Sequence, residues 1–216
     1  ISALNGDNVV EPSEHMSWYE GPTVLRHLET VHIASDKNLV DFRFPVSYVI
    51  RPDLNFRGYA GRVASGVVRP GDEVTVLPSG KSSTVKEVVT LTGNQEEAFA
   101  SQSVTITLND EIDISRGDML VRSCNQPQLA NAVDAHVCWM HEEPMVPTKT
   151  YIIRQGPREL RTRIKDIHYK IDMNTLHRVD TDGIALNEIG KISLKTSEKI
   201  AFDSYSANRR TGNFII

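Results

Sequence analysis

Cysteine is scarce in this sequence of 216 residues, which contains only Cys124 and Cys138. Two cysteines are too few for the disulfide framework of a small secreted protein, and no CxxC pair suggests a zinc site, so we expect a reducing, cytoplasmic compartment. Long apolar runs are also missing. No stretch approaches the ~20 residues that cross a bilayer, so we expect no membrane partner.

An excess of positive charge is missing as well. The chain has 24 Lys and Arg against 28 Asp and Glu, which gives a net charge of −4. Proteins that bind nucleic acid usually carry a basic surface that neutralises phosphates. Only residues 127–216 lean towards basic, with 13 Lys and Arg against 11 Asp and Glu. We therefore expect no nucleic-acid partner.

The sequence motifs of nucleotide hydrolysis are absent. There is no GxxxxGK[ST] loop to hold phosphates and no NKxD string to bind guanine. Asp180-Thr181-Asp182-Gly183 spells DxxG, but it lies among turn residues, so we interpret it as a turn. The neighbouring Glu142 and Glu143 would point to opposite faces of a strand and cannot form an acid–base couple. We expect no catalytic residue in this chain.

One short helix is expected near the start of the chain. Pro22 suits the first helical position, because its missing N–H would have had no partner there. Val24, Leu28 and Val31 follow at helical spacing. The pattern predicts a helix over Pro22–Val31, with the helical segment over by Ala34–Asp36.

Both ends of the chain look cut. Ile1–Leu4 reads like the end of a buried strand, and Asn213–Ile216 reads like the middle of another. We therefore interpret the sequence as a fragment.

The periodicity changes from helical to extended at Phe42. Apolar and polar residues then alternate through Ile50, as in a half-buried strand, where Pro45 needs an edge or a bulge. Further strands are expected at Arg57–Val68, Glu73–Leu77, Ser82–Leu91, Ser103–Leu108, Met119–Arg122, Ala130–Trp139, Lys149–Arg154, Leu160–Tyr169, Glu188–Leu194 and Asn213–Ile216.

Frequent turn signals separate these short strands, and a polar break at Asn125–Gln128 divides them into two groups. This pattern indicates an all-β fold with two antiparallel β-barrels, preceded by the short helix. We expect three segments, which are residues 1–41, residues 42–126 and residues 127–216.

A family resemblance rests on three motifs. The glycine-punctuated run Asn55–Val74, which ends in a Pro-Gly-Asp turn, and the run Ile112–Leu120 resemble the second domain of elongation-factor-Tu-like GTPases. Between them, Gln95–Ala100 (QEEAFA), together with Asp53–Tyr59, is similar to the GTPase subunit of bacterial heterodimeric sulfate adenylyltransferase.

The resemblance implies a role for each segment. Residues 1–41 would end a GTPase domain, in which Ser2, Ala3 and Leu4 match the motif that touches the guanine base. Residues 42–126 and 127–216 would be barrel domains 2 and 3, the latter truncated. GTP and magnesium would bind in the intact parent, and neither is expected in this fragment.

The same resemblance implies partners and an activity. The partners would be the chain's own GTPase domain and a small catalytic subunit that makes adenosine 5′-phosphosulfate and pyrophosphate from ATP and sulfate. GTP hydrolysis on the large subunit would drive that reaction. The parent would thus be an enzyme, and this fragment alone would be inactive.

Several cations occur at strand spacing in the second half. Arg161, Arg163 and Lys165 would project from one strand face, opposite a mixed face, and could meet an acidic partner. The alternative is an ordinary solvated barrel face. His136 and Cys138 also share a strand face, which permits a metal site, although packing or surface histidine is the simpler interpretation.

Two other functions fit an all-β pair of barrels. One is the tRNA-binding region of a translation elongation factor, which the acidic net charge disfavours. The other is a free-standing β-barrel interaction module, which the cut-looking ends disfavour.

Overall fold

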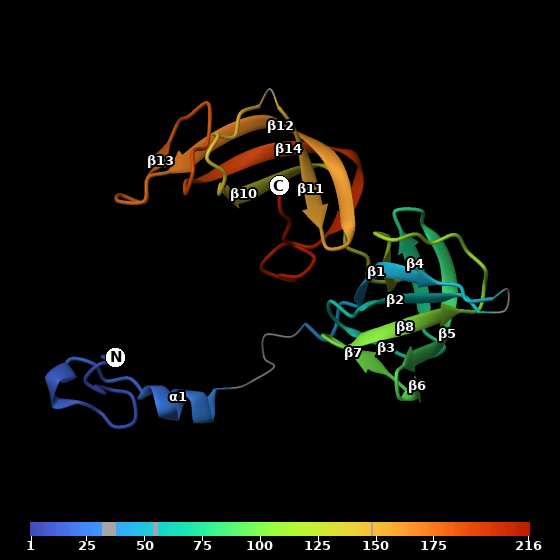
Figure 1. Ribbon diagram of the computed structural model, residues 1–216, viewed down its shortest axis with the longest axis horizontal. Helices are drawn as coiled ribbons and strands as arrows, with labels where there is room; N and C mark the ends of the chain where they lie inside the picture. The colour runs from blue at the N-terminus through green and yellow to red at the C-terminus, as the bar shows by residue number, and fades with distance from the viewer. Residues whose placement is uncertain (32–37, 54–55, 148) are drawn as a thin grey trace. The chain divides into compact units, whose positions relative to one another are not determined.

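The computed structural model of the chain describes residues 1–31, 38–53, 56–147 and 149–216, and most of its elements are β-strands (Figure 1). Residues 1–37 form one compact unit and residues 38–216 form another. The first unit holds the helical turn η1 (Glu14–Met16) and the helix α1 (Val24–Thr30), and every strand of the described residues lies in the second.

The helix α1 begins at Val24, two residues later than the sequence pattern places it at Pro22. Thr23 is the N-cap: its backbone is extended, and its hydroxyl accepts a hydrogen bond from the backbone N–H three residues on, at 3.4 Å. A capping hydroxyl accepts a hydrogen bond from a backbone N–H that has no partner within the helix. The helix therefore starts directly after Thr23. The helix ends at Thr30, while residues 34–36, where the helical segment was expected to be over, lie outside the described residues.

The first half of the second unit is a closed barrel. Six strands form a ring in the order β4-β9-β1-β2-β8-β5, and the ring closes because β5 pairs with β4. All pairs are antiparallel, and we call this ring the first barrel. The strands of this half are β1 (Arg43–Ile50), β2 (Gly58–Arg62), β3 (Val67–Val68), β4 (Glu73–Leu77), β5 (Lys81–Thr90), β6 (Gly93–Gln95), β7 (Ala98–Phe99), β8 (Ser103–Leu108) and β9 (Met119–Arg122).

The interior of the first barrel confirms the alternation expected after Phe42 only as far as Val46. Beyond a register shift, Tyr48 is 65% exposed and Val49 packs against the core, so the alternation expected through Ile50 is wrong there. Phe42, Phe44 and Val46 are fully buried, and Pro45 lies next to an irregularity in the pairing of β1 with β2. The core that these residues join also contains Tyr59, Val63, Val68, Val74, Val76, Val85, Val88, Ala98, Val104, Ile106, Ile114 and Leu120.

The strand expected over Arg57–Val68 is interrupted, which corrects the sequence prediction. Its two parts, β2 and β3, pair with different strands, and Gly66 ends the break between them. Gly66 has φ of +75°, and a Cβ there would lie 2.4 Å from the Cα of Phe42. A left-handed backbone this close to another chain segment requires glycine, so the chain turns here instead of continuing as one strand.

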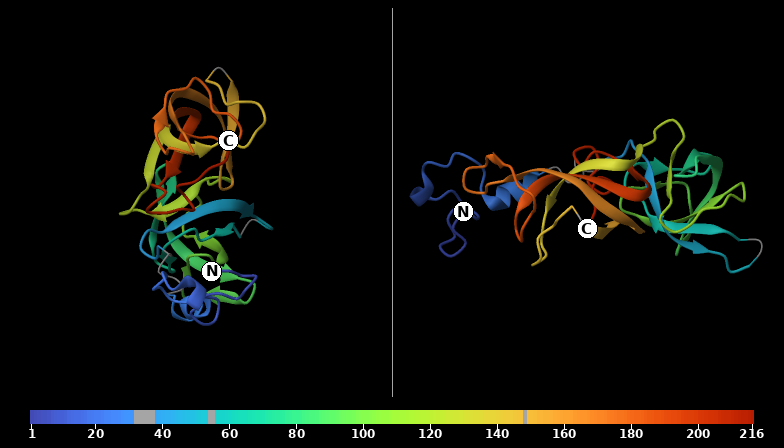
Figure 2. Two further views of the ribbon diagram at one scale, coloured as in Figure 1. Left: turned by 90° about the vertical axis from the view of Figure 1, so that its left-hand side faces the viewer. Right: turned by 90° about the horizontal axis from the view of Figure 1, so that it is seen from above.

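The second half of the second unit is one curved antiparallel sheet, which we call the second sheet. Its strands are β10 (Gln128–Cys138), β11 (Thr150–Gln155), β12 (Arg158–Ile171), β13 (Arg178–Val179) and β14 (Ile189–Phe202). The order is β10-β14-β12-β11, with β13 paired to β12. The long strands β12 and β14 lie side by side and bend along their length (Figure 2). Within the described residues the end strands β10 and β11 do not pair with each other. The second sheet is therefore open, whereas the first barrel is closed.

Two strand predictions in the second sheet are wrong. Strand β14 runs to Phe202, well past the expected end at Leu194, because Lys195 pairs with both neighbouring strands and residues 200–202 pair with β10. Asn213–Ile216 is not a strand, and only Ile215 makes an isolated bridge, to Arg154 of β11. The alternation of apolar and polar residues therefore underestimated the length of β14, which is extended by pairing with its neighbouring strands.

Candidate functional site

The residues expected to touch a guanine base form a turn in the first unit. The backbone N–H of Ser2 donates to the carbonyl of Asp7 at 3.1 Å, and Ser2 Oγ accepts from the N–H of Asn5 at 3.4 Å. Leu4 is 95% exposed, and Ala3 is exposed beside it. This segment is thus a bridged turn and not the end of a buried strand, which corrects that part of the sequence interpretation. Its role as a base-binding motif stays a prediction.

The possible metal pair His136 and Cys138 lies at the exposed end of β10. His136 Nε2 is 3.1 Å from the hydroxyl of Tyr169, and Cys138 is a free, exposed thiol. The described part of the chain contains no group of three His, Cys, Asp or Glu side chains that could hold a metal. It also contains no helix long and apolar enough to span a bilayer.

The strongest polar site of the second unit lies between the first barrel and the second sheet, at Arg43 of β1. This guanidinium is only 2% exposed, and its Nε and Nη2 each donate to a carboxylate oxygen of Asp203 at 2.9 Å. Nη1 donates to the carbonyls of Phe42 and Asn125, both at 2.9 Å, and Nη2 donates to Asn125 Oδ1 at 3.2 Å. All five guanidinium N–H donors are thereby used.

Further hydrogen bonds surround this ion pair, and the bond between Asn208 and Ser65 joins the same two parts of the unit. Asp203 also accepts a bond of 2.6 Å from the hydroxyl of Thr211. Asn208 Nδ2 donates to Ser65 Oγ at 2.6 Å. We refer to the side chains of Arg43, Asp203, Asn125, Asp41, Thr211, Asn208 and Ser65 as the junction.

Asp41 belongs to the junction through two amide donors. Asn38 Nδ2 and Asn125 Nδ2 each donate to its carboxylate at 2.6 Å. The bond from Asn38, then that from Asn125, lowers the pKa of Asp41, and the positive charge of Arg43 adds to them.

Sequence reasoning missed this site. Arg43 alternates with Phe42 and Phe44 in β1, so the period-2 pattern placed it on the solvent face. The face is covered instead, because Asp203, 160 residues away in the sequence, lies against it. The one local signal that Arg43 is buried was its position in the sequence directly between two aromatic residues, Phe42 and Phe44.

An apolar patch continues the contact beside the junction. Leu77, Met119 and Val121 of the first barrel pack with Ala201 of β14, and Leu129 of β10 packs against them. This small cluster, separate from the cores on either side, shows that the two parts share a dry contact as well as polar bonds.

Arg158 makes a second charged contact between these parts. Its Nη1 lies 3.8 Å from Oδ1 of Asp118, and its Nη2 donates to Oε2 of Glu198 at 2.7 Å. Burial raises the pKa of Asp118, against the opposing effects of the backbone N–H of Ser115 and the charge of Arg158. Both charges of the Arg158–Asp118 pair are therefore largely shielded from solvent by the contact.

Acid should weaken the second unit, because the carboxyls with a lowered pKa outnumber Asp118, whose raised pKa acts in the opposite direction. Hydrogen bonds lower the pKa of Asp41, of Asp172 through the N–H groups of Asn174 and Thr175, and of Glu188 through Lys170. A carboxyl whose folded pKa is depressed stabilises the fold above its unfolded pKa, about 4, and loses that contribution as pH falls through the folded value. We expect the melting temperature to be flat from about pH 7 to 5 and to drop below about pH 4.

Thermal melts between pH 7 and pH 3 measure this effect. The Asp41→Asn variant removes one titrating group, so its melting temperature should depend less on pH than that of the wild type. A melting temperature that does not change between pH 5 and pH 3 would contradict the expectation.

The three predicted cations are exposed on β12. Arg161 and Arg163 alternate with the buried Thr162 and Ile164, as the sequence pattern requires. Strict alternation then ends, because a bulge follows Ile164, and both Lys165 and the next residue face solvent. The opposite face is therefore mostly core rather than the mixed face expected.

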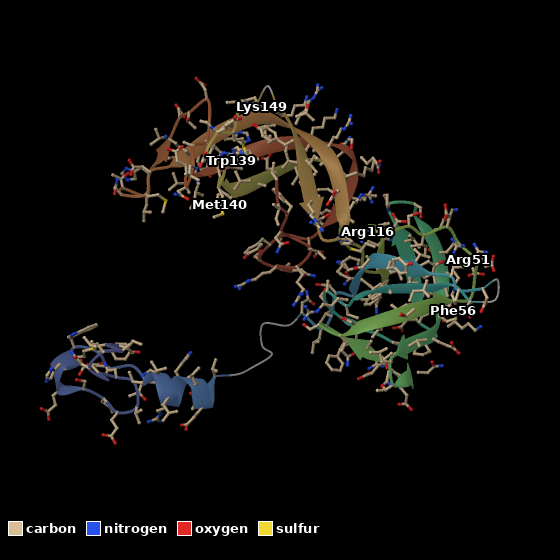
Figure 3. All side chains as sticks on the ribbon, in the orientation of Figure 1. Arg51, Phe56, Arg116, Trp139, Met140 and Lys149 are labelled. Atoms are coloured by element: carbon tan, nitrogen blue, oxygen red, sulfur yellow. The ribbon has the colours of Figure 1, made fainter. Side chains whose placement is uncertain are left out.

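A hollow of the second unit lies beside β10 of the second sheet. Its volume is about 990 Å³, and β10 and the last residues of the chain line it. Trp139 and Met140 lie at the end of β10 (Figure 3), and Trp139 Nε1 donates to the carbonyl of Glu143 at 2.7 Å. The lining is mainly apolar: Val133, Val137, Trp139, Met145, Ile200, Phe202, Phe214 and Ile216.

Family models match both parts of the second unit. Residues 59–121 match elongation factor Tu domain 2, and residues 132–216 match the model described as GTP-eEF1A C-terminal domain-like. Together these matches cover most of the first barrel, without β1, and most of the second sheet.

Curated relatives match along the whole chain. Sulfate adenylyltransferase subunit 1 of Aliarcobacter butzleri is 52% identical over 216 residues, which are 100% of this chain and 46% of that protein. The bifunctional enzyme CysN/CysC of Rhodopirellula baltica is also 52% identical over the whole chain, which spans 33% of its length. The protein of Bacteroides fragilis named sulfate adenylyltransferase subunit 1 is 51% identical. The chain thus spans less than half the length of these relatives.

Solved structures of translation GTPases share the fold. The structure of sup35 complexed with GMPPNP has a TM-score of 0.75 at 16% identity, over 99% of this chain and 53% of that chain. Elongation factor SelB of Methanococcus maripaludis has a TM-score of 0.63 at 18% identity, over 83% of this chain and 40% of that one. At such low identity these structures establish the fold alone. The identity to the curated relatives goes further, and the chain belongs, over all of its 216 residues, to the family of sulfate adenylyltransferase subunit 1, of which it forms the elongation-factor-like β-barrel region.

Proposed function

We propose that this chain is the barrel region of the GTP-hydrolysing subunit of a sulfate adenylyltransferase. The whole enzyme would convert ATP and sulfate into adenosine 5′-phosphosulfate and pyrophosphate for sulfate assimilation, with GTP hydrolysis as the driving reaction. The observation that carries the proposal is the 52% identity to sulfate adenylyltransferase subunit 1 along the entire chain.

Each segment has a place in this proposal. Residues 1–41 contain the end of the GTPase domain, with Ser2, Ala3 and Leu4 near the guanine base, and a linker, while residues 42–126 and 127–216 are the two barrel domains. GTP and magnesium bind through phosphate-loop motifs that this sequence does not contain. The barrel region is the non-catalytic part, which holds the GTPase domain and a small catalytic subunit in the cytoplasm.

The junction gives the barrel region a mechanical property that such a role needs. Five hydrogen bonds from one buried guanidinium reach Asp203, Asn125 and Phe42, and the apolar cluster around Leu77 and Met119 lies beside them. Because these contacts join the first barrel to the second sheet, a displacement of one part moves the other with it. The two parts would then transmit a domain movement as one body.

Complex formation tests the proposed function. The chain, purified alone, is mixed with the small catalytic subunit of a sulfate adenylyltransferase from the same organism, and the mixture is analysed by size-exclusion chromatography with light scattering. We expect a stoichiometric complex. If neither this chain nor the full-length subunit binds the small subunit, the proposed function is wrong.

A further inference from the structure

The outer side of the second sheet carries four exposed cations on two neighbouring strands. Arg161, Arg163 and Lys165 come from β12, and Lys195 comes from β14. Arg163 and Lys195 are direct cross-strand partners, so their side chains leave the same face with Cβ atoms about 5 Å apart. We call these four residues the basic face.

The cations of the basic face have no carboxylate partner. Within the described part of the chain, no Asp or Glu oxygen lies within 4.0 Å of their side-chain nitrogens. The hydroxyl of Thr150, which accepts a hydrogen bond of 3.3 Å from Arg163 Nε, is a neutral neighbour.

Several neighbouring cations of the second sheet are paired, although Lys199 of β14, like the basic face, has no ion pair among the described residues. Arg154 lies 3.5 Å from Glu159, Arg158 lies 2.7 Å from Glu198, and Lys170 lies 2.5 Å from Glu188. The chain has more acidic than basic residues overall, so carboxylates are not in short supply. The four cations of the basic face thus lie close together without a carboxylate partner, and like charges repel across the Arg163–Lys195 pair.

An exposed apolar residue adjoins these charges. Ile152 of β11 is the cross-strand partner of Arg161, and its side chain is 63% exposed on the same face. Protein interfaces typically combine an apolar centre with a polar rim, and Ile152 with the cations beside it provides both on a small scale.

From these observations we infer that the basic face docks an acidic surface of the small catalytic subunit, an inference that rests on the proposed function. Opposite charge on the partner relieves the repulsion between Arg163 and Lys195 and speeds the encounter of the two proteins. The face suits a protein better than RNA. It spans only about 13 Å along β12, and residues 127–216 exceed neutrality by only two charges, too few for a long phosphate backbone.

The experiment compares association rates of the chain with the small subunit by stopped-flow fluorescence. The test variant is Arg161→Glu with Arg163→Glu. The matched control is Lys81→Glu with Lys86→Glu, which makes the same change of net charge at exposed positions of β5 in the first barrel. Circular dichroism and melting temperatures check that both variants fold, as outward-facing charges contribute little to stability.

We expect the test variant to associate about tenfold more slowly than the wild type at low ionic strength, and the difference to shrink as salt is raised to about 0.5 M. The control should change the rate much less. Equal rates for wild type and test variant at low salt would overturn the docking surface while leaving the complex, and so the proposed function, intact. Failure of the wild-type chain to bind would overturn the docking surface, and failure of the full-length subunit as well would overturn both.

A parallel measurement separates protein from RNA. The wild type and the Arg161→Glu, Arg163→Glu variant are titrated with a bulk tRNA fraction in a filter-binding assay. We expect no binding below micromolar concentrations for either protein. Tight tRNA binding by the wild type that the variant loses would overturn the inference in favour of a nucleic-acid surface.

Discussion

Replacement of Arg43 by alanine should lower the free energy of unfolding by about 3–5 kcal/mol. The substitution leaves the carboxylate of Asp203, whose side chain is only 12% exposed, without its cation. It also removes the donors that satisfy the carbonyls of Phe42 and Asn125. Breaking a buried pair from one side is costly because the remaining charge keeps its desolvation penalty and loses its compensation.

Urea denaturation followed by tryptophan fluorescence and by circular dichroism measures this loss. Trp139 belongs to the core of the second sheet, so its fluorescence reports on that part, while circular dichroism reports on all strands. In the variant we expect the two signals to separate into two transitions, since the junction no longer couples the parts. Coincident transitions with wild-type stability would show that the apolar cluster alone joins them.

Two further variants control the Arg43 experiment. Arg69→Ala removes an exposed ion pair, Arg69–Glu97, and should change the unfolding free energy by less than about 1 kcal/mol. Arg43→Lys keeps the positive charge but lacks the planar fork that reaches Asp203 and Asn125 together, so it should fall between wild type and Arg43→Ala.

Replacement of Gly66 by alanine should also be strongly destabilising, by about 3 kcal/mol or more. Two costs add at this position. The backbone φ of +75° disfavours any side chain, and the new Cβ would lie 2.4 Å from the Cα and 2.5 Å from the backbone nitrogen of Phe42. Since backbone atoms cannot move aside as a flexible side chain can, the first barrel would have to deform.

The Gly71→Ala variant separates these two costs. Gly71 also has positive φ, +90°, but a Cβ there meets no atom within 4 Å. We therefore expect Gly71→Ala to cost about 1 kcal/mol, the price of backbone strain alone. Equal losses for the two variants in urea denaturation would show that the contact with Phe42 contributes nothing.

Local information predicted the short strands of the first barrel well. Strands β4, β8 and β9 have the bounds that the sequence pattern indicates, because turn residues such as Pro70, Gly71 and Gly117 border them. The extent of β14 could not be read in this way. Residues 195–199 are polar and hide the strand from the sequence pattern, while Lys195 and Thr196 pair with β12 and residues 200–202 pair with β10.

The same distinction between local and long-range information applies to the candidate sites. The sequence alone determined the all-β class, the family, and the three cations of β12, because alternation, turn chemistry and motif spelling are properties of neighbouring residues. Only the tertiary structure decided that Arg43 is buried and that Lys195 joins Arg163 on one face. Both depend on contacts between residues far apart in the chain, Arg43 with Asp203 and Arg163 with Lys195, and no local periodicity records which distant strand will cover or adjoin a given side chain.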